Sequence, residues 1–180
     1  MKEQLAPGID SMFYAVFVTP SESEKQEEAE DNAGLGEHIG SISLRLQPTG
    51  PSLPFPPSPS GLPISTTTTT LPVRVLGYAF FPSARGKGYA TEAGHALLNA
   101  YAAFTSSSPS SSSSHKDQCE EERAKRKTYI EAAVDEDNPG SIKVLEKLGF
   151  KKLGWKHEEE KVWLNGAWRG PGYWVYGLFV

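Results

Sequence analysis

The sequence predicts an α/β fold, in the broad sense that includes α+β, with a mixed and largely antiparallel sheet flanked by helices. Short runs rich in β-branched and aromatic residues recur along the chain, and Gly, Pro and polar stretches separate them, which is typical of strands. Two further segments carry apolar residues at three- and four-residue steps, which is typical of amphipathic helices. The predicted order is strand, strand, strand, helix, strand, helix, strand, strand.

Length and composition limit the class of protein. The 180 residues suffice for one domain, and we expect a single domain over residues 1–180. The formal net charge of −4 argues against nucleic-acid binding, which needs a basic face. Cys119 is the only cysteine, which excludes an internal disulfide, and no metal-ligand spacing is present. The run MFYAVFV is too short to span a bilayer and no secretory signal precedes it, so we expect a soluble cytoplasmic protein without a membrane partner.

The first part of the chain contains two predicted strands and an insertion. Residues 12–18 and 38–46 are short apolar or alternating runs that predict strands, and residues 1–10 resemble the end of a helix. Residues 47–72 consist largely of Pro, Ser and Thr and repeat with neither a helical nor a strand period. Because such a segment cannot build a core, we expect a disordered insertion there.

The middle of the chain predicts a strand over residues 73–81 followed by a helix. The helix is indicated by one apolar stripe, formed by Ala90, Ala93, Leu97, Tyr101 and Phe104. A second low-complexity stretch at residues 105–114 ends it and is also interpreted as an insertion.

The last part of the chain predicts a strand over residues 128–134, a short helix and two more strands. Asn138 suits the N-cap of the helix, Pro139 its first position and Gly149 the position just after its end. Its apolar face is formed by Ile142, Leu145 and Leu148. The final two strands are expected to be joined by the turn RGPG.

The segment RGKGYA, residues 85–90, lies between a predicted strand and a helix. Backbone N–H groups at a helix N-terminus have no partner within the helix, and together with the helix dipole they form an anion site. Gly86 and Gly88 let the backbone approach a phosphate closely, and Arg85 and Lys87 add positive charge. Neither the P-loop pattern nor the dinucleotide fingerprint fits. On the loop alone, an ordinary turn into a helix is an equally good interpretation.

Two linked motifs resemble the GNAT superfamily of N-acetyltransferases, and within it the branch of ribosomal-protein N-terminal acetyltransferases. Arg85, Gly88 and Ala90 fill the fixed places of that family's pyrophosphate loop, Q/R-x-x-G-x-G/A. The segment from Asn138 to Phe150 is similar to its second signature, an Asn followed by a short helix that ends in LGF. The resemblance covers roughly residues 12–180 apart from the two insertions.

The resemblance implies acetyl-CoA as acetyl donor, no metal, and a primary amine of unknown identity as acceptor. In this family the strands on either side of the first helix splay apart, and the pantetheine arm of the cofactor pairs with the freed edge, here Tyr78 to Phe81. Asn138 and Ser141 are then expected near the thioester. The cofactor-binding residues implied are Phe80, Phe81, Arg85, Gly86, Lys87, Gly88, Tyr89, Ala90, Asn138 and Ser141. A monomer and a homodimer both remain open.

Catalytic groups are harder to identify. Many family members carry a Tyr as general acid on the second helix, and this chain has Leu145 at that place. Ser141, one turn earlier, is the substitute donor that we consider, with an ordinary first-turn serine as the alternative. Glu131 is a candidate base through a water, with a solvent-facing strand residue as the alternative. His38 is a further candidate base, with a surface histidine as the alternative.

Two other features leave alternatives open. The C-terminal aromatic residues Trp163, Trp168 and Tyr173 belong either to core strands or to the acceptor pocket. The family normally opens with a strand and two helices before the segment FYAVFV, whereas only about ten residues precede it here, so we hypothesise that this chain lacks that quarter of the fold. This departure and the absent Tyr leave a second function open, that of a weak or inactive acyl-CoA-binding module.

Overall fold

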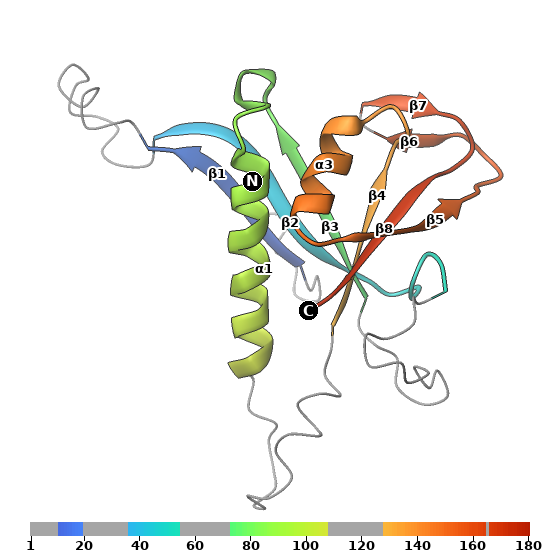
Figure 1. The fold of residues 1–180 in the computed structure, drawn as a ribbon, viewed down its shortest axis with the longest axis horizontal. Helices are drawn as coiled ribbons and strands as arrows, with labels where there is room; N and C mark the ends of the chain where they lie inside the picture. Colours follow the sequence, from blue (N-terminus) through green and yellow to red (C-terminus); the bar gives the residue numbers. More distant parts are fainter. Residues whose placement is uncertain (1–10, 20–35, 55–72, 108–127, 165) are drawn as a thin grey trace, which may run out of the picture.

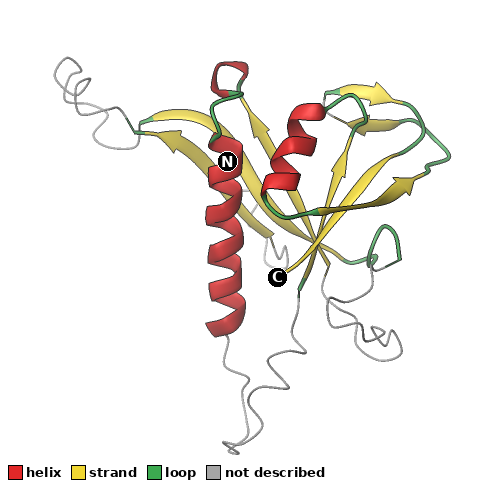
Figure 2. Ribbon diagram, viewed as in Figure 1, coloured by secondary structure: helices red, strands yellow, loops and turns green. Residues whose placement is uncertain are grey.

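The computed structural model describes residues 11–19, 36–54, 73–107, 128–164 and 166–180. Two helices lie on one face of a twisted sheet, and a small hairpin stands at the end of the molecule (Figures 1 and 2). The expected segments 1–10, 55–72 and 108–114 lie outside the described residues. Among the described residues, no helix is long and apolar enough to cross a membrane.

The main sheet has six strands in the order β1-β2-β3-β4-β8-β5. Every neighbouring pair is antiparallel except β3 and β4, which are parallel, so the predicted mixed and mostly antiparallel sheet is confirmed. The strands of this sheet are β1 (Ser11–Val18), β2 (Glu37–Gln47), β3 (Val73–Phe80), β4 (Tyr129–Val134), β5 (Lys151–Lys156) and β8 (Tyr173–Phe179).

The two parallel strands at the centre of the sheet separate after a short contact. Val73–Val75 of β3 pairs with Tyr129–Glu131 of β4, and no pairing continues beyond these residues. The rest of β3 still pairs with β2 on its other side, so only its β4-facing edge is released. The splay that the family resemblance implied is therefore present between β3 and β4.

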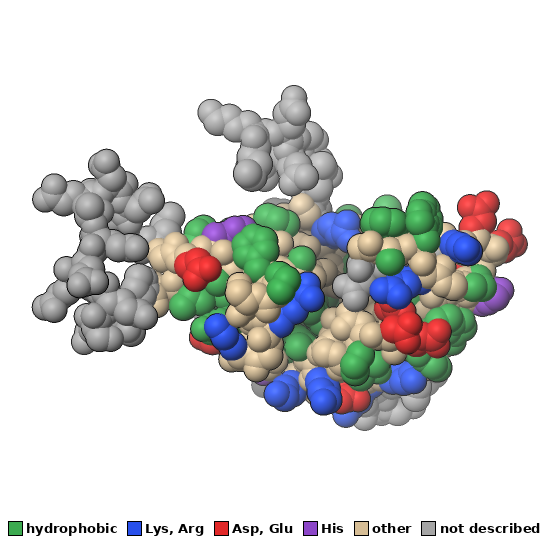
Figure 3. Space-filling view, turned by 90° about the horizontal axis from the view of Figure 1, so that it is seen from above, with side chains coloured by type: hydrophobic (Ala, Val, Ile, Leu, Met, Phe, Trp, Pro, Cys, Tyr) green, Lys and Arg blue, Asp and Glu red, His purple; other side chains and the backbone are tan. Residues whose placement is uncertain are grey.

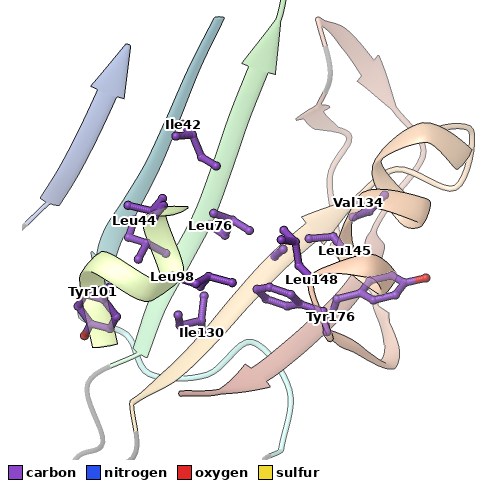
Figure 4. Close-up of a cluster of buried hydrophobic side chains, with 13 residues drawn as sticks. Ile42, Leu44, Leu76, Leu98, Tyr101, Ile130, Val134, Leu145, Leu148 and Tyr176 are labelled. Atoms are coloured by element: carbon purple, nitrogen blue, oxygen red, sulfur yellow. The ribbon is translucent and has the colours of Figure 1, made fainter. Parts of the chain in front are cut away.

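The helices α1 (Tyr89–Ser107) and α3 (Pro139–Lys147) cover the same face of the sheet (Figure 1). They approach closely at Gly94, because a Cβ there would lie only 2.6 Å from Leu148 Cδ1. The core between helices and sheet includes Leu44, Ile130 and Leu145, none of which is exposed (Figure 4). Burial of apolar side chains from both helices is what fixes the helices on this face.

The predicted caps of α3 are confirmed. The side chain of Asn138 accepts a hydrogen bond from the N–H of Ser141 at 3.1 Å, and Pro139 occupies the first helical position. Leu148 is the C-cap, and Gly149 follows it with φ 88°, a conformation that glycine adopts without a steric penalty.

The prediction for the C-terminal strands is wrong in two respects. The segment KKLGWK forms β5, which the sequence did not indicate because it has no β-branched residue and only two apolar ones, Leu153 and Trp155, among lysines and glycine. The turn RGPG does not join two paired strands. Instead β6 (Val162–Leu164) pairs with β7 (Ala167–Arg169) in a separate hairpin, and β8 pairs with β4 and β5 in the main sheet.

The prediction that residues 47–72 are a disordered insertion is wrong for its first part. Gln47 is the last residue of β2, and the chain then turns and runs over the sheet up to residue 54. The N–H of Ser52 donates to both carboxylate oxygens of Glu131 at 3.0 Å, and Leu53 contacts Gly154 of β5. A buried carboxylate needs such donors, and this requirement orders the segment.

The second low-complexity stretch also begins inside regular structure, because α1 continues through Ser107. The hydroxyl of Thr105 donates to the carbonyl oxygens of Tyr101 and Ala102 at 3.1 and 3.0 Å. These bonds to the preceding turn let a Thr remain in the helix where composition predicted its end.

Candidate active site

A cavity of about 520 Å³ opens between the end of β3 and the two helices. One wall is formed by the end of β3, the loop after it and the first turn of α1, and the other wall by α3. The end of the molecule at which this loop and the β6–β7 hairpin lie is seen from above in Figure 3, where Lys and Arg side chains lie across the middle of the face beside apolar ones.

Most of the residues expected to bind a cofactor meet at this cavity. Those that line it are Phe80, Arg85, Gly86, Gly88, Tyr89, Ala90, Asn138 and Ser141. They come from two segments about fifty residues apart that the sheet brings face to face. Three predicted site residues, Phe81, Lys87 and Glu131, are not among the residues that line it.

The loop before α1 presents free backbone donors to the cavity. Gly86 and Gly88 have φ 76° and 91°, and nothing lies within 4 Å of where their Cβ atoms would be, so open space faces both. The N–H groups of Thr91 and Glu92 already donate to the carbonyl oxygen of Gly88. For the N–H groups of residues 86–90, the described part of the chain provides no acceptor. These donors stand at the positive end of a 19-residue helix and form an anion site.

Arg85 is held at the edge of this anion site by a contact with β3. Its Nε donates to the carbonyl oxygen of Phe80 at 3.1 Å. The other guanidinium N–H groups remain available, because Arg has five donors in a fixed plane. The positive charge therefore stands beside the free N–H groups of the loop.

Tyr78 joins the two walls at the part of the cavity lined by Tyr78 and Ser141, which we call the throat. Its hydroxyl, on β3, donates to the carbonyl oxygen of Ser141 on α3 at 3.3 Å. Burial raises the pKa of Tyr78 above its usual 10.0, and an interaction with the side-chain hydroxyl of Ser141 opposes this effect. A side chain that the sequence indicated only as part of a strand edge thus fixes the distance between β3 and α3.

Phe81 and Lys87 do not line the cavity although they belong to the same loop. The ring of Phe81 lies edge-on to His38 at 5.4 Å, and His38 in turn lies 5.3 Å from Phe17. His38 is exposed and does not line the cavity. Within one loop, some residues therefore line the cavity, whereas Lys87 is exposed and Phe81 packs against β2.

The expectation of a solvent-facing Glu131 is wrong. Only 2% of this residue is exposed, and both carboxylate oxygens accept from the N–H of Ser52 on the face of the sheet opposite the helices. Burial and the nearby Glu131 charge raise the pKa of Tyr129, which keeps its hydroxyl protonated. Since Glu131 does not line the cavity, its geometry supports an anchor for residues 48–54 and not a base.

Few side chains at the cavity can exchange protons. None of the described residues that line it is an Asp, a Glu or a His. Leu145, at the place of the family's Tyr, is 0% exposed and packs in the core. Within the described residues, no group of three His, Cys, Asp or Glu side chains could hold a metal ion.

The β6–β7 hairpin is attached to the end of β4, close to the helix α3. Arg169 Nε lies 2.6 Å from Asp135 Oδ2, and Asp135 follows directly on β4. On this hairpin Trp163 and Trp168 pack edge-to-face with their ring centroids 5.4 Å apart, and 61% and 66% of their surfaces are exposed. They are therefore not core residues, and a place on the acceptor side stays a prediction.

Comparison with known proteins assigns the family. The model of the acetyltransferase (GNAT) domain family matches residues 10–151 of the 180-residue chain. This match includes both motifs that line the cavity and covers well over half of the chain. The chain belongs to the GNAT acetyltransferase domain family, as its two motifs predicted, and its sheet and splayed strands are those of that fold.

Similar solved structures include three acetyltransferases. They are Mycobacterium smegmatis RimJ in complex with CoA-disulfide (20% identity, TM-score 0.46, covering 81% of this chain and 50% of that one), the ribosomal-protein-S5-alanine acetyltransferase from Vibrio fischeri (20%, 0.44, 79% and 54%) and a GNAT-family acetyltransferase from Bacillus anthracis (18%, 0.41, 78% and 58%). The chain spans little more than half the length of these proteins. Likeness at this level does not bear on substrate, because one fold hosts many functions. No curated protein matches the chain.

Proposed function

We propose that this chain binds acetyl-CoA in the cavity between β3, the loop at residues 81–88 and α3, and transfers the acetyl group to a primary amine. The observation that supports this most directly is that two features lie next to each other: the unpaired edge of β3 and the N–H groups of residues 86–90, which have no acceptor among the described residues. The first suits an extended chain with amide groups, and the second suits a pyrophosphate. Coenzyme A carries both, joined end to end.

In this proposal the pyrophosphate lies on the N–H groups of residues 86–90, with Arg85 beside it. The pantetheine arm pairs with the β4-facing edge of β3 from Leu76 to Phe80, as an added strand would. Asn138 caps α3 through its side-chain oxygen, so its amide NH₂ remains available to the pantetheine carbonyls. The thioester then lies near Tyr78 and Ser141.

The reaction needs a neutral amine and a protonated leaving group. The amine nitrogen attacks the thioester carbonyl carbon, the C–S bond breaks, and the thiolate takes up a proton while the nitrogen loses one. The hydroxyl of Ser141 is the donor to the sulfur, and Tyr78 positions it through the bond to the Ser141 carbonyl. With no carboxylate or imidazole on the described lining, an α-amine with pKa near ~8 is a better acceptor than a lysine near ~10.4.

A second candidate is an acyl-CoA-binding module with little or no turnover. The observation that favours it is the same lack of proton-exchanging side chains on the lining, together with the burial of Leu145. The two candidates share the cofactor site and differ only at the throat of the cavity. They are therefore separated by turnover and not by binding.

The test is calorimetric titration of the chain with acetyl-CoA, beside the variants Arg85→Glu and Lys87→Glu. Both variants reverse one charge in the same loop, but only Arg85 lines the cavity. Losing one charge-assisted contact at the anion site should weaken binding about tenfold or more in Arg85→Glu and by much less in Lys87→Glu. Acetylation of peptides with free N-termini, followed by mass spectrometry, then separates a transferase from a binding module. A folded chain that binds no acetyl-CoA would overturn the proposal.

A further inference from the structure

The second wall of the cavity carries two cations that the sequence motifs do not explain. Lys143 and Lys147 both line the cavity, and they lie one turn apart on α3. Residues four apart on a helix have their Cβ atoms about 5–6 Å from each other and point to the same side. With Arg85, they are the charged side chains of the described lining, and all three are positive.

Neither lysine has a partner that would account for its position. Within the described residues, no ion pair or hydrogen bond engages Lys143 or Lys147. Like charges four apart on a helix destabilise it slightly, and Lys143 lies too far from the C-terminus of α3 to gain from the helix dipole. An anion placed between the two ammonium groups would offset their repulsion.

The proposed cofactor carries more negative charge than Arg85 and the N-terminus of α1 together neutralise. A pyrophosphate diester carries about two negative charges, and Arg85 with the N-terminus of α1 supplies about one and a half positive charges. A phosphomonoester such as the 3′-phosphate of coenzyme A adds about −1.5 to −2 at neutral pH. The two lysines on α3 match this second group in charge and face the cavity from the other wall.

We infer that Lys143 and Lys147 form a phosphomonoester site that binds the 3′-phosphate of coenzyme A and lets the protein discriminate coenzyme A from dephospho-coenzyme A. This inference rests on the proposed function, because it assumes that the cavity takes the cofactor. Both lysines start from consecutive turns of one helix, and their flexible stems let the two ammonium groups reach one phosphate. A phosphate with three terminal oxygens accepts hydrogen bonds from both ammonium groups at once.

The experiment is calorimetric titration with coenzyme A and dephospho-coenzyme A of the wild-type chain, the double variant Lys143→Ala/Lys147→Ala, and the control Lys151→Ala. Lys151 is an exposed lysine on β5 that does not line the cavity. We expect the wild-type chain and the control to bind coenzyme A about tenfold or more tightly than the dephospho form, as for one or two charge-assisted hydrogen bonds. In the double variant the ratio should fall to near one, with the affinity for dephospho-coenzyme A unchanged within about twofold.

Further variants and ligands keep the test specific. The double variant Lys143→Arg/Lys147→Arg should retain the discrimination, because it keeps both charges. Adenosine 3′,5′-bisphosphate should compete with coenzyme A in the wild-type chain and about tenfold less well in the double Ala variant. Equal wild-type affinities for the two cofactors would overturn the inference while leaving the proposed function intact. Failure of the folded chain to bind either cofactor would overturn both.

Discussion

The two ends of the cavity are built in different ways. At the proposed phosphate end, backbone N–H groups of residues 86–90 have no acceptor among the described residues, and Arg85 stands beside them. At the throat, the two walls are joined by the side chain of Tyr78, whose hydroxyl bonds to α3, and few groups can exchange a proton. In the proposed function, cofactor binding therefore depends on backbone geometry at one end, and acetyl transfer depends on single side chains at the other.

The largest expected effect comes from adding a side chain at the phosphate end. Gly88→Ala places a Cβ in the space that faces the cavity and forces a non-glycine residue to φ 91°. We expect a loss of about 1–2 kcal/mol in the free energy of unfolding from the backbone strain, and a drop in acetyl-CoA affinity of at least about tenfold. Urea denaturation and calorimetric titration measure the two effects separately.

Gly50→Ala is the matched control for this prediction. Gly50 has φ 80°, also with nothing within 4 Å of its Cβ position, but it lies in the turn after β2 and does not line the cavity. It should lose a similar free energy of unfolding and keep its affinity. Equal affinity losses in both variants would show that strain, and not contact with the cofactor, explains the result.

A smaller effect is expected at the throat from Tyr78→Phe. Removing the hydroxyl leaves the Ser141 carbonyl without this donor and should lower the free energy of unfolding by about 1–1.5 kcal/mol at neutral pH. Acetyl-CoA affinity should change by less than about threefold, because the anion site is untouched. If the chain is a transferase, turnover should fall more than affinity, which direct comparison of the rate and the dissociation constant checks.

The pH dependence of stability gives a second measurement on the same residue. Because burial raises the pKa of Tyr78 above 10.0, its stabilising contribution is complete below pH 10 and is lost as the pH rises through the folded-state pKa. The wild-type chain should therefore lose its advantage over Tyr78→Phe above pH 10. Tyr129 titrates in both proteins, so the difference between them isolates Tyr78. A constant difference across this range would contradict the assigned effect of burial.

The smallest effects separate the two roles given to Asn138. Asn138→Ala removes the cap of α3 and should cost about 1 kcal/mol of stability, whereas Asn138→Ser keeps a capping oxygen and should cost only a few tenths. Both variants lose the side-chain NH₂ group. If this group binds the pantetheine arm, both should lose affinity equally despite their different stabilities. Full affinity in Asn138→Ser would limit Asn138 to capping.

Local sequence signals predicted much of the fold and the turn with free N–H groups at the start of α1. Pro139 and the caps Asn138 and Gly149 act through hydrogen bonds and dihedral preferences within a few residues, so their type and spacing were sufficient. The same holds for residues 86–90, because a glycine-containing turn before a helix leaves its first N–H groups free wherever the helix is placed.

Other features depend on contacts between residues that are far apart in the sequence. β5 forms although its residues have little strand propensity, because β8 offers it a hydrogen-bonding edge. The N–H of Ser52 bonds to the carboxylate of Glu131, which is 79 residues away, and the composition of the segment around Ser52 does not predict that contact. The sequence gives no reason to distinguish Lys143 and Lys147 from other lysines on a helix surface. The structure places both on the cavity lining, together with the loop before α1.

The sequence by itself determined the order of strands and helices up to α3, the caps of α3, the glycine-containing turn before α1 and the family, because each depends on short-range spacing. Only the tertiary structure decided where the strands separate, which of the loop residues face the cavity, that Tyr78 joins its walls and that Glu131 lies on the opposite face. These outcomes depend on sheet register and on the close approach of α1 and α3 at Gly94. Both are set by the burial of side chains far apart in the chain.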